Sequence, residues 1–147
     1  MRILSAGVAL LVALAVSGPV YALEFRSISD DLTVLYDAPS KDSAKRLILT
    51  RGYPVEVIIA SGDWVRVRDD KGTFAWVETG KLAKNRMVMV IAANVEGRSA
   101  ADKSAQVVFK VNKGVVLEFV GVTGGWAKVR HHSGAVAFIR LGDLWGV

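Results

Sequence analysis

An internal repeat with an offset of 62 residues constrains this chain more than any other feature. Residues 52–82 and 114–144 align without a gap, and ten of the 31 aligned positions are identical. Four of the identical positions are glycines, and the tryptophan, a valine and an arginine of one short segment are also identical. A fixed period of this length indicates one supersecondary unit that occurs twice. The sequence therefore predicts two small units of one kind.

The N-terminal segment has the pattern of a secretory signal peptide. Arg2 gives a basic start, residues 3–16 are mostly apolar, and Val20 and Ala22 are the small residues before a cleavage site after Ala22. An uncleaved membrane anchor is the alternative, but this apolar run is shorter than the roughly 20 residues that a spanning helix needs. We therefore predict a signal peptide over 1–22, no stable membrane span after cleavage, and a periplasmic or extracellular location.

The amino-acid composition excludes several kinds of chemistry, membrane anchoring and binding partner. The chain has no cysteine, which excludes disulfides, thiol catalysis and lipoprotein anchoring. Cleavage would leave 147 − 22 = 125 residues. Two units of about 60 residues would each be marginally stable alone, so we expect them to pack against each other. The net charge of +5, or +4 without Arg2, indicates a mixed basic surface; attraction to anionic wall polymers or lipid headgroups is the alternative. Nucleic acid is not expected as a partner, because no basic run is interleaved with aromatic residues.

Alternation with a period of two predicts short strands, and no window shows sustained helical periodicity. In the first copy the expected strands are 32–35, 47–49, 55–59, 64–68 and 73–77. The clearest hairpin joins the last two and recurs as 126–130 and 135–139. We therefore predict an all-β fold of two tandem five-stranded barrels, with domains at 23–84 and 85–147.

The two faces of this hairpin differ in character. Successive side chains of a strand point to opposite faces, so Val67 is expected in the core while Trp64 and Arg66 share the other face. The second copy places Trp126 and Lys128 in the same way. Each tryptophan is therefore expected on a basic face, where it caps the end of a barrel or stands exposed.

Residues 62–67 and 124–129 both fit the pattern G-[DG]-W-x-[KR]-V, and a second glycine-led segment and a closing leucine follow in each copy. With these motifs the chain resembles the bacterial Src-homology-3-like (SH3-like) domains. The resemblance implies five-stranded barrels that bind ligands and do not catalyse reactions. Residues 94–98 fit the pattern less well, and we expect a one-residue bulge there.

The resemblance also implies where a ligand would bind. In eukaryotic relatives a groove reads proline-rich ligands, and Tyr36 and Trp64 match two of its aromatic positions, whereas Glu78 and Lys81 replace the others. The aromatic floor is therefore incomplete, which argues against polyproline recognition. Many bacterial members bind cell-wall peptides. The candidate ligand-binding residues are Tyr36, Trp64, Arg66, Trp126, Lys128 and Trp145.

Other chemistry is not indicated by the sequence. His131 and His132 are adjacent in a hairpin turn, where they point in different directions and seldom chelate one metal. No nucleophile, base or carboxylate pair forms a catalytic pattern, so we predict no enzyme, no metal and no cofactor. Trp145 is expected to dock in the seam between the units, and an exposed partner contact is the alternative.

Two functions follow from these observations. The first is a non-enzymatic exported binding module for peptidoglycan peptides or an envelope protein. The alternative is a structural or assembly scaffold that acts through barrel–barrel contact or self-association. The exposure of Trp64 and Trp126 separates the two, because an open groove indicates a ligand site and burial in the seam indicates architecture.

Overall fold

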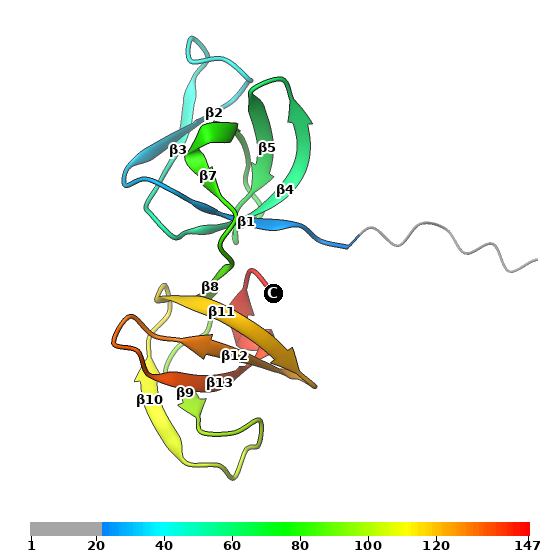
Figure 1. Cartoon of the computed structure of the whole chain (residues 1–147). Coiled ribbons are helices and arrows are strands. Elements are labelled where there is room, and N and C mark those ends of the chain that lie inside the picture. Colours follow the sequence, from blue (N-terminus) through cyan, green and yellow to red (C-terminus); the bar gives the residue numbers. More distant parts are fainter. Residues whose placement is uncertain (1–21) are drawn as a thin grey trace, which may run out of the picture.

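A computed structural model describes residues 22–147, so the predicted signal peptide lies outside the described residues except for Ala22. The described chain forms two all-β units stacked end to end (Figure 1). Besides strands it contains two 3-10 turns, η1 (Thr79–Lys81) and η2 (Leu141–Asp143). Within residues 22–147, no helix is long and apolar enough to cross a membrane.

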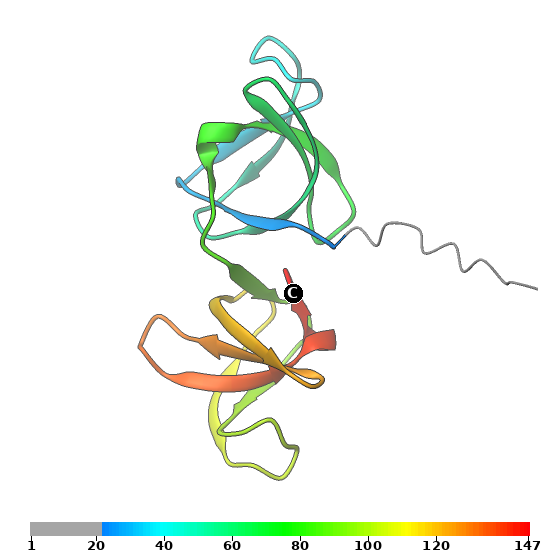
Figure 2. The same ribbon diagram turned by 45° about the vertical axis from the view of Figure 1, so that its right-hand side comes forward.

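Domain 1 is one antiparallel sheet of seven strands, in the order β3-β2-β6-β5-β4-β1-β7. The sheet curls around its own core (Figure 2). Its strands are β1 (Phe25–Ile28), β2 (Thr33–Tyr36), β3 (Lys45–Leu49), β4 (Pro54–Ser61), β5 (Trp64–Arg68), β6 (Phe74–Glu78) and β7 (Leu82–Ala83).

Domain 2 repeats this sheet strand by strand, in the order β10-β9-β13-β12-β11-β8-β14. Its strands are β8 (Met87–Val90), β9 (Val95–Arg98), β10 (Val107–Val111), β11 (Val116–Thr123), β12 (Trp126–Arg130), β13 (Val136–Arg140) and β14 (Leu144–Trp145). Each begins 62 residues after its counterpart, so the gap-free repeat runs through every strand.

The predicted all-β fold of two units of one kind is confirmed, with more strands per sheet than the five expected. The additional strands are β1 and β7, which pair with each other at the edge of the sheet. Strand β1 was not predicted from the sequence, because the polar residues Arg26 and Ser27 interrupt its apolar pattern. Ser27 is nonetheless buried, and its hydroxyl donates to the carbonyl of Asn85 over 2.9 Å.

The pairing of β9 with β10 does shift by one residue at Gly97 and Arg98, but the extra residue lies on β10, between Val107 and Phe109. The β2–β3 pairing of domain 1 has the same shift, so a bulge does not explain why 94–98 match less well. The poor sequence match has a packing cause. Gly97 stands where domain 1 has the fully buried Leu35, and the ring of Phe109 fills the vacated space, with Cε2 only 2.7 Å from where a Gly97 Cβ would lie.

Each domain has its own apolar core. The valines assigned to the inner face of the hairpin are buried, with Val67 and Val129 at 1% and 0% exposure. Burial of such side chains stabilises each unit by about 1.5–3 kcal/mol per residue.

The seam between the domains is formed by Phe25 and Pro54 of domain 1 and by Arg86, Trp145 and Gly146 from the linker and domain 2. The Trp145 indole meets the Phe25 ring edge to face at 5.1 Å, and its Nε1 donates to the Pro54 carbonyl over 2.9 Å. Arg86 Nη2 donates to the Gly146 carbonyl over 2.8 Å. The expectation that Trp145 docks in the seam is therefore confirmed.

Candidate ligand-binding grooves

Each domain has a groove of about 240 Å³ at the same place in its sheet. Groove 1 is lined by Asp31, Leu32, Thr33, Val34, Tyr36, Lys41, Glu78 and Lys81. Groove 2 is lined by Ala92, Ala93, Asn94, Val95, Glu96, Arg98, Trp126, Arg140 and Asp143. Seven residues of groove 2 lie 62 positions after a residue of groove 1, so the repeat has preserved the site as well as the sheet.

Both grooves open beside an unusual turn. Leu32 and Asn94 are the two non-glycine residues with positive φ among residues 22–147, at 54° and 53°. This left-handed conformation is uncommon for a branched side chain such as leucine and is better tolerated by asparagine. The Leu32 side chain is also 72% exposed at the rim of groove 1. Backbone strain of this kind gathers at functional sites, which supports a binding role for the two turns.

Groove 1 has an aromatic wall. Tyr36 from β2 lines it, and Trp64 from β5 packs edge to face against Tyr36 with ring centroids 5.7 Å apart. Across the sheet, Tyr36 pairs with Trp76 of β6. All three rings are half-buried, so each offers an edge or a face to a ligand without leaving its position in the fold.

Two ion pairs flank this aromatic wall. Lys41 meets Glu78 at 3.1 Å, and the Lys81 ammonium donates to Asp30 over 2.7 Å. The hydrogen bond from Lys81, followed by its positive charge, lowers the pKa of Asp30, and the same bond raises the pKa of Lys81. Both signs of charge are therefore available to a ligand that lies across groove 1.

Groove 2 replaces the tyrosine with arginine. Arg98 occupies the position of Tyr36, and its Nη2 donates to Glu96 over 2.5 Å. The Arg140 guanidinium lies 5.0 Å from the centre of the Trp126 ring, a cation–π contact, and Arg140 stands where groove 1 has Glu78. Groove 2 therefore carries two arginines beside the acidic Glu96 and Asp143, whereas groove 1 carries two lysines, acidic residues and the Tyr36 ring.

The structure distributes the candidate ligand-binding residues over several places. It brings Tyr36 and Trp64 together beside groove 1 and places Trp126 in groove 2, so the two tryptophans lie in separate sites. Arg66 stacks over the ring of Phe74 at 4.6 Å. Lys128 is exposed on β12.

The remaining candidate, Trp145, is occupied by the seam, so we leave it out of the grooves.

Sequence reasoning missed two residues that line groove 1, Lys41 and Leu32, and it missed Asp30, which pairs with the groove residue Lys81. Lys41 comes from a polar loop that shows no pattern, and Asp30 depends on a contact with a residue 51 positions away. Leu32 gave no signal, since leucine does not mark a left-handed turn. The alignment of Leu32 with Asn94 was the available clue, because asparagine favours that conformation.

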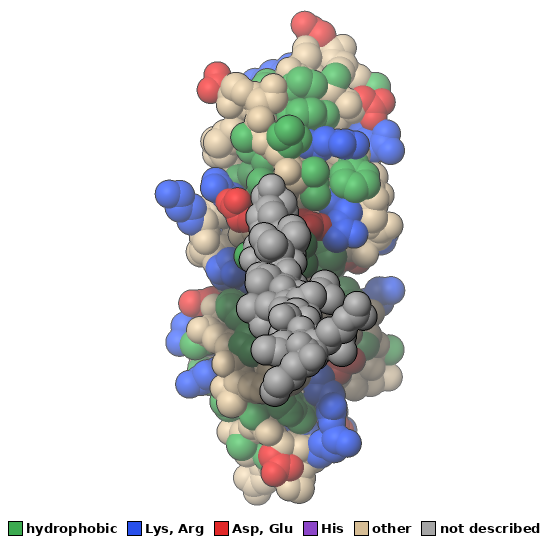
Figure 3. All heavy atoms as spheres, turned by 90° about the vertical axis from the view of Figure 1, so that its right-hand side faces the viewer, with side chains coloured by type: hydrophobic (Ala, Val, Ile, Leu, Met, Phe, Trp, Pro, Cys, Tyr) green, Lys and Arg blue, Asp and Glu red, His purple; other side chains and the backbone are tan. Residues whose placement is uncertain are grey.

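The histidine pair lies in the hairpin turn, as predicted. The expectation that the two side chains point in different directions is wrong, because the ring centroids of His131 and His132 lie 3.9 Å apart. His131 Nδ1 is 2.9 Å from the hydroxyl of Ser133. In the described part of the chain, no three His, Cys, Asp or Glu side chains are grouped so that they could hold a metal ion. On the face shown in Figure 3, basic and acidic side chains are interspersed over both domains, as expected for a mixed surface.

The repeated sheet and its paired grooves define a tandem pair of SH3-like domains. A family model described as "Bacterial SH3 domain" matches residues 29–84 and again 92–146. The chain belongs to this family. No curated protein matches the chain.

The similar solved structures are longer than this chain. NlpC2 of Trichomonas vaginalis is 12% identical with a TM-score of 0.38, covering 84% of this chain and 48% of its own. An NlpC/P60 family protein of Bacillus cereus is 14% identical with a TM-score of 0.39, covering 83% and 56%. NlpC1 of T. vaginalis is 13% identical with a TM-score of 0.36, covering 92% and 50%. The chain thus spans about half the length of these structures.

Proposed function

We propose that this chain is an exported, non-catalytic binding module that recognises peptides of the cell wall or of an envelope protein through groove 1. The observation that carries the proposal is the edge-to-face pair of Tyr36 and Trp64, flanked by ion pairs and placed beside a strained turn. Membership of the bacterial SH3 domain family supports a binding role.

The chemistry of groove 1 suits a short peptide that carries both amino and carboxylate groups. The rings of Tyr36 and Trp64 would contact its apolar part, since aromatic side chains provide much of the energy at binding sites. Lys41 and Glu78 already pair at 3.1 Å and are partly exposed, so a ligand with both charges can exchange partners with them. Such an exchange costs little, because exposed ion pairs contribute only about 0–1 kcal/mol.

Retention on purified sacculi at low salt tests the wall version of the proposal. The protein starting at Leu23 should be retained, and Trp64→Ala should weaken retention about tenfold, the loss expected for one aromatic contact. Ile48→Ala is the matched control, because this side chain is 62% exposed in domain 1 and outside groove 1. If the unsubstituted protein is not retained at low salt, the wall version is wrong.

The two grooves can be separated with the same assay. Trp126→Ala alters groove 2, where Arg98 and Arg140 stand in place of Tyr36 and Glu78, so its ligand is expected to differ from that of groove 1. Equal losses for Trp126→Ala and Trp64→Ala would contradict the assignment of wall binding to groove 1. N-terminal sequencing of the exported protein tests the location, and a mature form that begins at Met1 would contradict it.

A scaffold that acts by self-association is the second candidate. It is favoured by neighbouring exposed apolar side chains on β4, where Ile58 and Ile59 are 41% and 55% exposed. Contiguous exposed apolar side chains often mark protein contacts. Sedimentation tests the scaffold, and a strict monomer at high protein concentration would count against it.

A further inference from the structure

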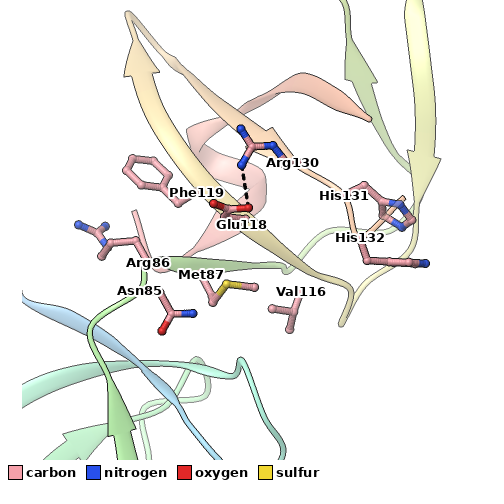
Figure 4. A pocket seen from close by; sticks show the side chains of 9 residues that line it. All are labelled: Asn85, Arg86, Met87, Val116, Glu118, Phe119, Arg130, His131 and His132. Atoms are coloured by element: carbon pink, nitrogen blue, oxygen red, sulfur yellow. Dashed lines mark hydrogen bonds and ion pairs between the residues drawn. The ribbon is translucent and has the colours of Figure 1, made fainter. Parts of the chain in front are cut away.

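A cavity of about 670 Å³ lies on domain 2 where it faces domain 1. We call it the seam groove. It is lined by Asn85, Arg86, Met87, Val116, Glu118, Phe119, Arg130, His131 and His132. In Figure 4 the ion pair of Glu118 and Arg130 stands on one side of the groove, above Met87 and Val116.

The repeat shows what the seam groove is built to hold. Met87, Val116 and Arg130 lie 62 positions after Phe25, Pro54 and Arg68, respectively. In domain 1 these three residues contact Trp145. Its ring meets Phe25 at 5.1 Å, its Nε1 donates to the Pro54 carbonyl over 2.9 Å, and the Arg68 guanidinium lies 5.3 Å from its centre. The seam groove is therefore the second copy of a site that binds an indole.

This second copy holds no indole of the described chain, for a simple reason. The residue of β7 that corresponds to Trp145 of β14 is Ala83, and both pair with their neighbouring strand in the same register. The methyl group of Ala83 lines an adjoining cavity of about 430 Å³, which shares Met87 and Val116 with the seam groove. A small residue therefore leaves uncovered the surface that corresponds to the one Trp145 covers on domain 1.

The charge of the site has changed between the copies. Arg86, His131 and His132 of the seam groove stand where domain 1 has Glu24, Asp69 and Asp70. Three acidic side chains are thus replaced by one guanidinium and two imidazoles.

Two features of Arg86 and Arg130 also favour the binding of an anionic group in the seam groove. The Nε of Arg86 is buried without a hydrogen-bond partner among the described residues. Arg130 meets Glu118 at 2.9 Å, and both side chains remain about half exposed. The seam groove is therefore suited to a carboxylate next to an aromatic ring.

We propose that the seam groove binds an extended peptide segment of a partner protein, one that presents an aromatic side chain beside a carboxylate. The ring lies against Met87 and Val116, as Trp145 lies against Phe25 and Pro54. A ring N–H or O–H donates to the Val116 carbonyl, and the carboxylate meets Arg86 and the histidines. This site is separate from groove 1, so it stands or falls independently of the wall-binding proposal.

The tail of the chain supplies a probe, because residues 143–147 read Asp-Leu-Trp-Gly-Val and already fit the equivalent site. This pentapeptide is titrated into ¹⁵N-labelled protein that starts at Leu23. Amide resonances of Met87, Val116 and Arg130 should shift with a Kd of about 0.1–1 mM, as expected for a single anchoring ring. The indole N–H resonance of Trp145 should stay in place, because its own site is already filled. The peptide Asp-Leu-Ala-Gly-Val should cause no shifts.

Three variants sharpen the experiment. Ala83→Trp should place an indole of the chain itself in the seam groove and abolish binding. Arg130→Ala should weaken binding several-fold, and Lys110→Ala, an exposed cation on β10 outside the groove, should leave it unchanged. If Ala83→Trp does not fold, Arg130→Ala and the alanine peptide still test the proposal.

Three outcomes would overturn it. The first is the absence of shifts at millimolar peptide. The second is shifts centred on Phe25 and Pro54 with loss of the Trp145 indole signal, which would mean that the probe only replaces the tail. The third is shifts that depend on protein concentration without peptide, which would make a second copy of the chain the occupant.

Discussion

The indole of Trp145 donates a hydrogen bond to the carbonyl of Pro54, 91 residues earlier in the chain, over 2.9 Å. A residue of the last strand of domain 2 thereby closes onto the first residue of β4 in domain 1. The contact is reinforced by Arg86, which donates to the Gly146 carbonyl and lies near the rings of Phe25 and Phe119 at 5.9 and 4.8 Å. Units too small to be very stable alone gain burial from such a seam.

Removal of the Trp145 side chain should loosen the seam and destabilise the protein. Because the indole is half-buried, Trp145→Ala should cost about 2 kcal/mol, less than the roughly 3–5 kcal/mol of a core tryptophan. Trp145→Phe keeps a ring but loses the donor to Pro54, and should cost about 1 kcal/mol. Urea unfolding measures both changes. A loss in Trp145→Phe as large as that in Trp145→Ala would mean that the ring itself contributes nothing.

The core of domain 2 contains an exchange of volume that makes a compensatory test. Gly97 and Phe109 correspond to Leu35 and Leu47 of domain 1. In domain 2 the side chain on β9 is therefore smaller, and the side chain on the neighbouring strand β10 is larger. A Cβ at Gly97 would meet the Phe109 ring at 2.7 Å and the Ala137 Cβ at 2.8 Å. Gly97→Leu should therefore destabilise domain 2 by about 1–3 kcal/mol or more through overpacking.

The second substitution should rescue the first. In Gly97→Leu with Phe109→Leu, domain 2 has the same pair as domain 1, and stability should return to within about 1.5 kcal/mol of the unsubstituted protein. Thermal unfolding followed by circular dichroism measures all three variants. Gly142→Ala is the control, because no atom lies within 4 Å of its added Cβ. Additive losses in the double variant would contradict the compensation.

The same pair shows how far the sequence could predict the fold. The gap-free offset of 62 predicted two sheets of one kind, and alternation predicted the strands, because both depend on local patterns. The sequence alone could not explain why residues 94–98 fit the family pattern poorly. The cause is the exchange between Gly97 and Phe109, which lie on strands that meet only in the folded sheet. A bulge was the local explanation, and packing is the actual one.

The site was less predictable than the fold. Tyr36 and Trp64 could be assigned to one groove because a family motif relates them. The Lys81–Asp30 pair and the left-handed Leu32 depend on tertiary contacts and on backbone conformation, which leave no mark in a single sequence. The seam groove is an intermediate case, because the offset aligns Ala83 with Trp145, but only the structure shows what Trp145 covers.

The Lys81–Asp30 pair should make the stability of domain 1 depend on pH. The Lys81 hydrogen bond and charge lower the pKa of Asp30 from 3.8, so the pair stabilises the fold above that value. This stabilisation is lost as the pH falls through the lowered pKa and Asp30 takes up a proton. It should also be weaker in high salt, since both groups are exposed.

Substitution of the carboxylate measures this contribution. The difference in unfolding midpoint between the unsubstituted protein and Asp30→Asn should be present at pH 7 and shrink as the pH falls through the lowered pKa of Asp30. Asp42→Asn is the control, because this carboxylate forms no ion pair within residues 22–147. A difference that persists unchanged at low pH would mean that the charge of Asp30 is not its cause.

The repeat also provides one ion pair in two environments. Arg68 donates through Nε to Glu56 over 2.6 Å, and the Glu56 side chain is 8% exposed. The equivalent Arg130 pairs with Glu118, whose side chain is 50% exposed. Arg68→Ala leaves a buried carboxylate unpaired and should cost about 3–5 kcal/mol, whereas Arg130→Ala should cost at most about 1 kcal/mol.

The origin of that asymmetry can be tested in the same urea experiment. If the cost of Arg68→Ala comes from the unpaired charge, adding Glu56→Gln should restore a large part of the stability, because a neutral amide is less costly to bury. Some loss should remain, since Arg68 also lies 5.3 Å from the Trp145 ring and a cation–π contact contributes about 0.5–1 kcal/mol. Equal costs for the two arginine variants would show that burial of the carboxylate does not decide the effect.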